Sequence, residues 1–450
     1  MTNTRSPIRI GMVAWGALPC IVEQTRTKGK HTFGKTFGGM ETAMWTLARG
    51  LAKQKHNHVT CFVAASQSRN GNAPWPHQVS DVHLQVCVDR FRAIRHDVGD
   101  SIDVRQRRLK RFSPNLLWQI PLLGLTRPFR SRDPGDCQPD PNLAGQSMDA
   151  WITFGINGAS SRVVATARAT GTPSFVCIRS NSGVEDRLAS AEEYHNECGE
   201  SATSRRFALL ESDHVVVQSQ WQLDRLRDVF HRDGYLARNP IDRFHWRPPI
   251  DPPSPESVSE PFDILWIGRF DDFHKRPRLM LEIAKTLPHR TIKMIANPFD
   301  AELEADLRRN APTNVEWIDR VPFAQMPATF QRAKVFVSTG NPEHEGFPNV
   351  LLQAAASHTP IVSISDHDQF LARSGAGISC NESIDAMPHA IEKLLGRAGE
   401  AATQIDWPRV DAYLDEHHQT ERVAADLSRW IHASIQAADR KPPEAPSHPC

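Results

Sequence analysis

A carboxylate, a glycine and the expected start of a helix follow one another in the second half of the chain. Residues 345–348 read Glu-Gly-Phe-Pro, and they come after an apolar run at residues 334–338 with the length and β-branched content of a fully buried strand. Proline is accepted at the first position of a helix because its missing N–H would have no partner there. The N–H groups of Asn349, Val350 and Leu351 should then face the carboxyl edge of a sheet, where a diphosphate is stabilised.

A second group of charged residues follows another expected strand. The apolar run at residues 262–267 ends close to Gly268, and Arg269 and Lys275 lie on the loop before the next helix. An arginine and a lysine fixed in this way stabilise the negative charge that develops on a departing pyrophosphate. The alternative, two solvated loop cations, stays open because charged side chains usually lie at the surface.

Two adjacent glycines precede a helical pattern in the first half of the chain. Gly38 and Gly39 come directly before a segment whose apolar residues recur at helical spacing, namely Met44, Leu47, Ala48 and Leu51. Glycines let a ligand approach the backbone closely, and the start of a helix offers N–H donors. A simple loop turn is the alternative, because glycine is common in turns.

Taken together, these segments resemble the signature of the retaining glycosyltransferases of family four (glycosyl transferases group 1), which have the GT-B fold. In that family a Glu followed by Gly-Phe lies eight positions before a second Glu. Glu345, Gly346 and Phe347 match this pattern, whereas Gln353 stands where the second Glu is found. An amide still accepts and donates hydrogen bonds, but it lacks the charge that strengthens them.

The resemblance implies roles for individual residues. Glu345, Arg269 and Lys275 are the expected catalytic residues, with the two cations on the diphosphate. The expected donor-binding residues are Gly38, Gly39, Gly346, Phe347, Asn349, Val350, Leu351 and Gln353. Many members of the family carry a His after an N-terminal strand, but here the strand expected at residues 174–178 is followed by Arg179, so the resemblance names no catalytic base. No metal ligand and no cofactor is expected, with a nucleoside-diphosphate sugar as co-substrate.

The order of apolar runs and helical patterns predicts an α/β fold with two Rossmann-like, doubly wound domains. Strands are expected at residues 8–15, 58–65, 83–88, 151–154, 174–178, 214–217, 262–267, 291–296, 314–318, 334–338, 360–365 and 377–380. By the resemblance the two domains face each other across a cleft. The predicted parts are an acceptor-side domain at 1–246, a proline-rich linker at 247–261, a nucleotide-sugar domain at 262–405, terminal helices crossing back at 406–436 and a disordered tail at 437–450.

Composition limits the classes of protein and partner. The 450 residues include 53 Lys and Arg against 52 Asp and Glu, so no overall charge favours nucleic acid. The eight cysteines form no CxxC pair, which indicates reduced thiols and a cytoplasmic protein. No signal peptide and no uninterrupted apolar segment long enough to cross a membrane is evident.

A basic segment followed by an apolar one gives a hint about the acceptor. Residues 90–111 contain eight Lys and Arg, and residues 116–125 are mostly apolar. Such a pair of segments is able to contact an anionic membrane at its inner face, which would favour a lipid-linked or glycan hydroxyl as acceptor. The alternative is a solvated helix face next to ordinary core, because Pro114 and Pro121 limit the length of a helix.

Three other functions remain open from the sequence. Residues 29–36 fit the P-loop expression G-x-x-x-x-G-K-[ST] of an NTPase or kinase, although no strand precedes them and Gly38 and Gly39 would interrupt the helix. Asp366 and Asp368 have the D-x-D spacing of metal-dependent glycosyltransferases, but a helix-capping Asp suits this position better. Gln353 is also compatible with a non-catalytic protein that only binds a nucleotide sugar.

Overall fold

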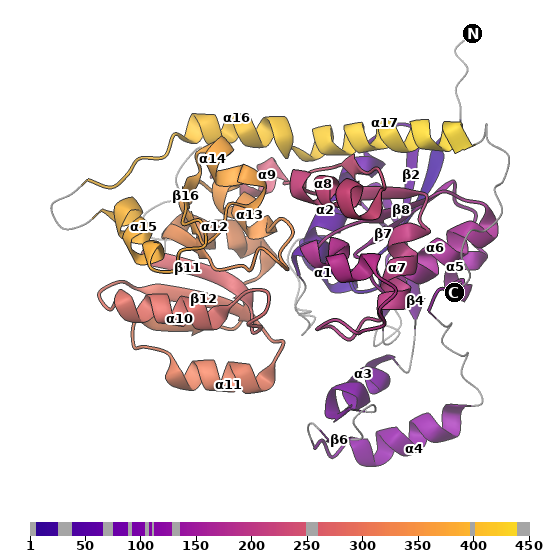
Figure 1. Ribbon diagram of the computed structural model, residues 1–450, viewed down its shortest axis with the longest axis horizontal. Helices are drawn as coiled ribbons and strands as arrows, with labels where there is room; N and C mark the ends of the chain where they lie inside the picture. The colour runs from indigo at the N-terminus through magenta and orange to yellow at the C-terminus, as the bar shows by residue number, and fades with distance from the viewer. Residues whose placement is uncertain are drawn as a thin grey trace, which may run out of the picture.

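A computed structural model describes residues 6–25, 38–65, 75–88, 92–103, 108–109, 112–127, 136–248, 260–396 and 401–438. Two α/β domains lie side by side, and two helices at the end of the chain run along both of them (Figure 1). The P-loop expression at 29–36, most of the expected linker and most of the expected tail fall outside the described residues.

The N-terminal sheet has the strand order β10-β9-β8-β7-β1-β2-β4-β3. Its strands are β1 (Ile8–Val13), β2 (Asn57–Ala65), β3 (Gln78–Val79), β4 (Val82–Val88), β7 (Ala150–Phe154), β8 (Ser174–Cys177), β9 (His214–Val217) and β10 (Tyr235–Leu236). All neighbours are parallel except β3 and β4. The chain adds strands on one side of β1 and then on the other, so the order reverses between β1 and β7.

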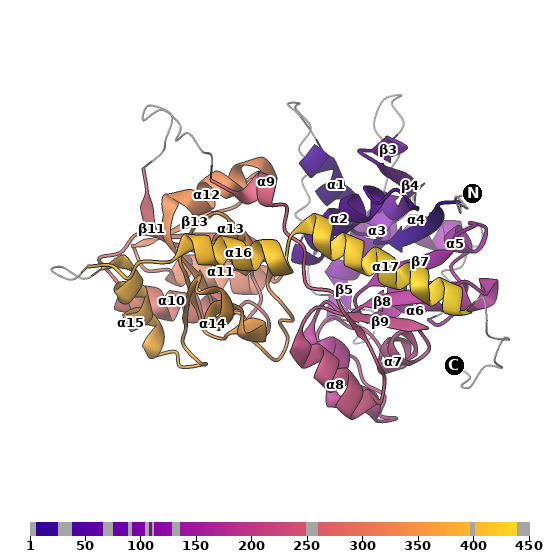
Figure 2. The same cartoon turned by 90° about the horizontal axis from the view of Figure 1, so that it is seen from above.

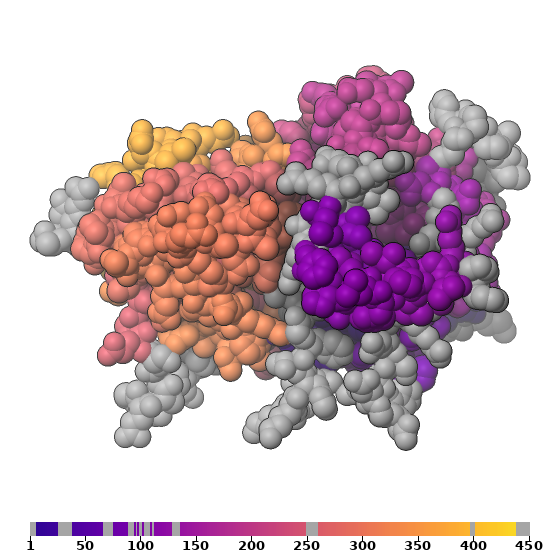
Figure 3. All heavy atoms as spheres, turned by 90° about the horizontal axis from the view of Figure 1, so that it is seen from below, coloured from indigo at the N-terminus to yellow at the C-terminus, as the bar shows by residue number. Residues whose placement is uncertain are grey.

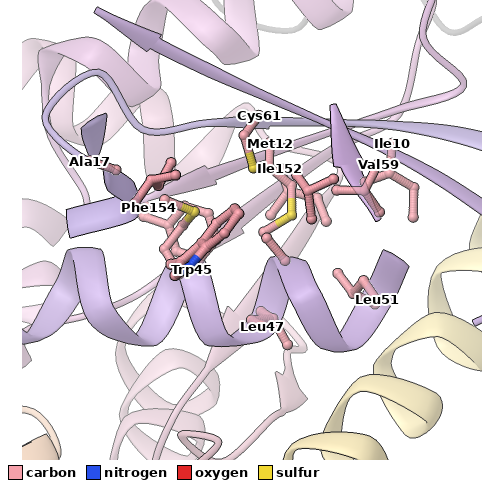
Figure 4. Close-up of a cluster of buried hydrophobic side chains, with 14 of the residues drawn as sticks. Ile10, Met12, Ala17, Trp45, Leu47, Leu51, Val59, Cys61, Ile152 and Phe154 are labelled. Carbon is pink, nitrogen blue, oxygen red and sulfur yellow. The ribbon is translucent and has the colours of Figure 1, made fainter. Parts of the chain in front are cut away.

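Helices cover both faces of this sheet. They are α1 (Leu18–Thr25), α2 (Gly39–Ala52), α5 (Pro141–Ala144), α6 (Gly158–Thr170), α7 (Ala202–Leu210) and α8 (Gln220–Phe230), whereas Trp246 of the following α9 (Arg243–Trp246) packs into the core of the C-terminal domain. Trp45 of α2 is completely buried and lies against the strands that carry Met12, Cys61 and Ile152 (Figure 4). This contact fixes the position of α2, and therefore of the glycines at its start, on the sheet.

The C-terminal sheet is entirely parallel, in the order β13-β12-β11-β14-β15-β16. Its strands are β11 (Phe262–Arg269), β12 (Ile292–Asn297), β13 (Val315–Ile318), β14 (Ala333–Ser338), β15 (Ile361–Ser363) and β16 (Gly377–Ser379). The helices are α10 (Pro277–Thr286), α11 (Ala301–Asn310), α12 (Met326–Arg332), α13 (Asn349–Ala356), α14 (Phe370–Ser374) and α15 (Ala386–Leu395). Each predicted strand of this half is present, and its bounds differ by two residues or fewer.

The strand order of the C-terminal sheet reverses between β11 and β14. Open α/β sheets bind ligands outside the carboxyl ends of the strands at such a point, because the two following loops diverge and leave a crevice. Arg269 is the last residue of β11, and the segment that contains Glu345 follows β14. The two segments predicted to contact the diphosphate and the donor sugar therefore lie at the point where the strand order of one sheet reverses, which is called its switch point.

The last two helices connect the domains. Val410 and Leu414 of α16 (Trp407–His417) pack into the core of the C-terminal domain, whereas Val423 and Leu427 of α17 (Thr420–Ala438) pack into the N-terminal core. Seen from above, the two helices follow one another across both domains (Figure 2). Between them, the carbonyl of His418 accepts a hydrogen bond of 2.8 Å from the N–H of Ile241.

A small lobe projects from the N-terminal domain on the side opposite α16 and α17 (Figure 1). It contains α3 (Arg92–Ser101), the short strands β5 (Ile102–Asp103) and β6 (Arg108–Leu109), and α4 (Leu116–Thr126), and it stands in front when the molecule is viewed from below (Figure 3). Leu117, Trp118 and Leu125 of α4 are 74%, 50% and 76% exposed. The alternative that this apolar segment is ordinary core is therefore wrong, and α4 continues through Pro121.

Within the described residues, no helix has the length and apolar character needed to cross a membrane.

We expect Gly50→Ala to destabilise the protein although Gly50 lies inside α2. Replacing glycine by alanine inside a helix usually stabilises the protein by roughly 0.5–1 kcal/mol. Here, however, the added Cβ would lie 2.7 Å from Cβ of Ala424 and 2.9 Å from Cγ2 of Thr420 on α17. Overpacking of this kind costs about 1–3 kcal/mol. Thermal unfolding should therefore show a lower melting temperature for Gly50→Ala.

The matched control is Gly124→Ala on α4, where nothing lies within 4 Å of the added Cβ. It should keep or raise the melting temperature. If Gly50→Ala behaves like Gly124→Ala, then α17 does not pack on α2 as described.

Candidate functional site

A cavity of about 650 Å³ opens between the two domains, at the carboxyl ends of both sheets. Nine of the eleven predicted site residues line it: Gly38, Gly39, Arg269, Lys275, Glu345, Phe347, Asn349, Val350 and Gln353. The segments identified in the sequence, which extend from Gly38 to Gln353, thus meet in one place.

Gly346 and Leu351 do not line the cavity. Leu351 is completely buried in the core of the C-terminal domain, and its N–H donates to the carbonyl of Pro348 at 3.1 Å. It therefore offers no free donor, and the expectation that it binds the donor is corrected. Gly346 is tightly enclosed, because a Cβ at this position would lie 1.9 Å from Nε2 of Gln218.

The centre of the site is an ion pair between the two loops at the switch point. Nζ of Lys275 lies 2.8 Å from Oε1 and 2.6 Å from Oε2 of Glu345, and the carboxylate side chain is only 8% exposed. Burial alone would raise the pKa of Glu345, but the charge of Lys275, the charge that His274 carries in acid when its ring is protonated, and the hydrogen bond from Lys275 outweigh it and hold the pKa at about 2. Glu345 is therefore ionised at neutral pH, so both of its oxygens act only as hydrogen-bond acceptors.

Two histidines stand close to this carboxylate. Nδ1 of His274 lies 3.3 Å from Oε2 of Glu345, and burial lowers the pKa of His274. Burial also lowers the pKa of His367 to about 4, although the charge of Glu345 and the carbonyl of Gly346 act in the opposite direction. Both rings are therefore expected to be neutral at pH 7, which leaves Lys275 as the full positive charge beside Glu345.

Arg269 is held at the edge of the cavity by its own loop. Its Nε donates to the carboxylate of Asp271, and its guanidinium lies 4.4 Å from the ring centre of Phe299. Asp271 also accepts the N–H groups of His274 at 2.7 Å and Lys275 at 3.0 Å, which shapes the loop. Within the described residues the terminal N–H groups of Arg269 have no protein partner, so they are free to meet an anion.

The starts of α13 and α2 face each other across the cavity. Nδ2 of Asn349 donates to the carbonyl of Gly39 at 2.6 Å, and Oδ1 of Asn349 accepts from Nδ2 of Asn239 at 2.8 Å. The N–H of Gly38 donates a hydrogen bond of 2.9 Å to the carboxylate of Glu41. The first N–H of the glycine pair is thus not a free donor for a ligand.

Sequence reasoning missed part of the N-terminal wall. Arg179 and Ser180, which follow β8, line the cavity, and so does the segment from Asn196 to Cys198. The sequence shows only that a charged residue, Arg179, follows a buried strand. That observation does not predict which residues or ligands the charge contacts.

The D-x-D spacing does not form a metal site in this structure. The carboxylate of Asp366 accepts the N–H groups of Leu371 at 2.8 Å and Ala372 at 3.0 Å, so it caps a helix as expected. Asp368 forms an ion pair with Arg238 and accepts the N–H of Gln220 at 2.8 Å. Among the residues that the structure describes, no group of three or more His, Cys, Asp or Glu side chains is arranged to hold a metal ion.

Similar solved structures confirm the predicted fold class, two α/β domains of the GT-B glycosyltransferase type. The sucrose-phosphate synthase from Thermosynechococcus elongatus is 14% identical, with 96% of this chain and 100% of that chain covered at a TM-score of 0.63. Anabaena HepE in complex with UDP and glucose is 10% identical, with 95% and 100% covered at a TM-score of 0.58. A trehalose-phosphate synthase (UDP-forming) from Burkholderia vietnamiensis is 11% identical, with 95% and 100% covered at 0.56.

Residues 261–397 match the model of the family described as glycosyl transferases group 1. No curated protein matches the chain. The matched segment contains Arg269, Lys275 and Glu345, and the match supports glycosyl transfer from a nucleotide sugar.

Acid should destabilise the centre around Glu345. The pKa of His367 is about 4 in the folded protein and 6.5 ordinarily, so the unfolded chain binds more protons between these values. The free energy of unfolding therefore falls as the pH drops from 6.5 towards 4. In His367→Phe this proton uptake is lost, and the melting temperature should decrease less over the same range.

The measurement is thermal unfolding at several pH values, with the surface variant His77→Gln as control. Equal acid sensitivity in the wild type and His367→Phe would contradict the description of His367 as a buried neutral histidine.

Proposed function

We propose that this protein is a retaining glycosyltransferase that moves a sugar from a nucleoside-diphosphate donor to a hydroxyl of an acceptor without a metal ion. The observation that carries the proposal is the meeting of Arg269, Lys275 and Glu345 at the switch point of the sheet, inside a cavity shared by two domains. The match to glycosyl transferases group 1 covers these three residues. Since HepE was solved with UDP and glucose, a uridine nucleotide is the first donor to test.

In the proposed reaction the two cations act on the leaving group. The bond between the sugar carbon and the diphosphate oxygen breaks, and the bond to the acceptor oxygen forms on the same face of the sugar. Arg269 and Lys275 stabilise the negative charge that develops on the diphosphate, which is the role a divalent cation has in metal-dependent enzymes. The leaving phosphate oxygen takes the proton of the acceptor hydroxyl.

Glu345 and Gln353 would orient the donor. The ionised carboxylate of Glu345 accepts hydrogen bonds from hydroxyls of the donor sugar, and Lys275 remains beside it. Gln353 lies on α13 in the wall of the cavity, eight residues after Glu345, where its amide can bind ribose hydroxyls. A protein that binds the nucleotide sugar without transferring it would use the same contacts, so only turnover separates the two functions.

We expect Lys275→Ala, Arg269→Ala and Glu345→Gln each to lower transfer by about 100- to 1,000-fold, because one charged partner of the transition state is lost. The assay is sugar transfer or donor hydrolysis with a panel of UDP, GDP and ADP sugars, with and without a chelator. Lys285→Ala, an exposed lysine on α10, is the control and should retain full activity.

Each outcome of this assay has a clear meaning. Nucleotides that raise the melting temperature without any turnover would point to a binding protein instead of an enzyme. Loss of activity on adding the chelator would contradict metal independence, and a product of inverted anomeric configuration would contradict retention.

The lobe formed by α3 and α4 supports a second part of the proposal, contact with an anionic membrane. Leu117, Trp118 and Leu125 expose apolar surface on α4, and residues 90–111 carry eight basic against three acidic residues. An apolar helix face beside basic residues is the composition that binds the surface of an anionic bilayer, where each cation contributes about 1 kcal/mol. The acceptor would then be a lipid-linked sugar or a glycan precursor at the membrane.

Binding to liposomes tests this contact. The wild type should co-sediment with vesicles that contain an anionic phospholipid and much less with neutral vesicles, and Leu117→Asp/Leu125→Asp should lose most of this binding. Phe244→Asp is a suitable control, because Phe244 is 98% exposed but lies on α9, outside the lobe. Equal binding to both kinds of vesicle, or full binding of the double variant, would reject the membrane contact.

A further inference from the structure

Arg179 occupies a fixed position on the N-terminal wall of the cavity. It follows β8 after one residue, and its neighbour Ser180 forms an isolated antiparallel bridge with Glu345. The N–H of Asn181 donates to the carbonyl of His344 at 3.2 Å. These contacts hold the backbone of Arg179 against the loop that presents Glu345, and therefore close to where the sugar and the acceptor would meet.

The other cations in the wall of the cavity have carboxylate partners. Lys275 pairs with Glu345, Arg269 with Asp271 and Arg320 with Glu23. Arg179 differs, because no residue in the described part of the chain forms an ion pair or a hydrogen bond with it, and its Nε is buried. Burial lowers the pKa of Arg179, and only the nearby Cys177 thiol acts against this.

The side chain of Arg179 is partly buried, and its Nε is enclosed without a partner among the described residues. Partial loss of hydration that no acceptor replaces costs free energy. Arg205 of the same domain shows which acceptors surround an arginine with a structural role. Arg205 is 1% exposed, and its guanidinium donates to the carboxylate of Glu185 at 2.6 Å, to the hydroxyl of Tyr194 at 3.3 Å and to the carbonyl of Ser182. Among the described residues Arg179 has no such set of acceptors, which leaves its terminal N–H groups available for a ligand.

We propose that Arg179 binds an anionic group, a phosphate or a carboxylate, on the acceptor substrate. The proposal rests on the glycosyltransferase function above and narrows its acceptor to an anionic class. In the proposed function Arg269 and Lys275 of the C-terminal wall bind the diphosphate of the donor, whereas Arg179 lies on the opposite, N-terminal wall. A guanidinium offers paired N–H donors in a plane, which fits both phosphate and carboxylate oxygens.

The experiment is a thermal-shift titration with UDP held at saturation, so that the donor half of the cavity is filled. The probes are glucose 6-phosphate and inorganic phosphate for the phosphate class, glucuronate for the carboxylate class, and glucose as the neutral control. The wild type should be stabilised by one of the anionic classes and not by glucose. Arg179→Gln should weaken that binding at least tenfold and keep the shift caused by UDP.

One further measurement and two further variants separate binding from a structural role. Arg179→Gln without ligand should melt at or above the wild-type temperature, because it removes a partly buried charge that has no partner among the described residues. Arg179→Lys, which keeps the charge but not the planar pair of donors, should retain part of the binding. Arg187→Gln, an exposed arginine of the same domain, should behave like the wild type.

Several results would overturn the proposal. One is a wild type that responds equally to glucose and to all the anions. Another is an Arg179→Gln variant that loses the UDP shift together with the anion shift, which would place Arg179 in the donor site. A lower melting temperature of the ligand-free Arg179→Gln variant, with anion binding retained, would show a structural role. If UDP gives no shift but an anion shift that depends on Arg179 persists, the proposed donor chemistry fails and the anion site stands.

Discussion

The ion pair between Lys275 and Glu345 is the contact on which the rest of the cavity depends. It joins the loop after β11 to the loop after β14, and Arg276 strengthens the same junction by donating to the carbonyls of Thr339 at 2.7 Å and Gly340 at 2.8 Å. A buried carboxylate is tolerable only with a charged partner, so loss of Lys275 would leave Glu345 both unpaired and buried. The lysine thus stabilises the buried carboxylate of Glu345, and in the proposed function it also meets the diphosphate of the donor.

The Glu345 loop is also held from the other domain. Nδ2 of Asn181 donates to the carbonyl of Pro342 at 2.7 Å, and Nδ2 of Asn349 donates to the carbonyl of Gly39. On a separate side of the cavity, Glu23 of α1 accepts the N–H of Phe323 at 2.8 Å. Each such bond contributes about 1 kcal/mol net, so the walls are held together by many small contacts. Each of these bonds could be exchanged for a bond to water at a small cost in free energy.

The buried parallel strands could be predicted from sequence because each reads as a short apolar run between turn signals, as in the strand that ends at Arg269. The contacts of single side chains could not. That Arg179 has no partner among the described residues follows from where the fold places it. Leu351 turns into the core although its neighbours Asn349 and Val350 line the cavity. The apolar run of α4 shows a third limit. A surface helix and a core helix of the same composition look alike until the neighbours are known.

The glycine pair at the start of α2 does not form an open phosphate-binding site in this chain. The carboxylate of Glu41 occupies the N–H of Gly38 and brings a negative charge to the positive end of the helix. The carbonyl of Gly39 accepts from Asn349, and a Cβ on Gly39 would lie 3.2 Å from Nδ2 of that residue. The glycines therefore allow the two helix starts to approach each other across the cleft. Since Glu41 offsets the charge at the start of α2, Arg179 is the Lys or Arg that the described part of the N-terminal wall offers to an anionic ligand.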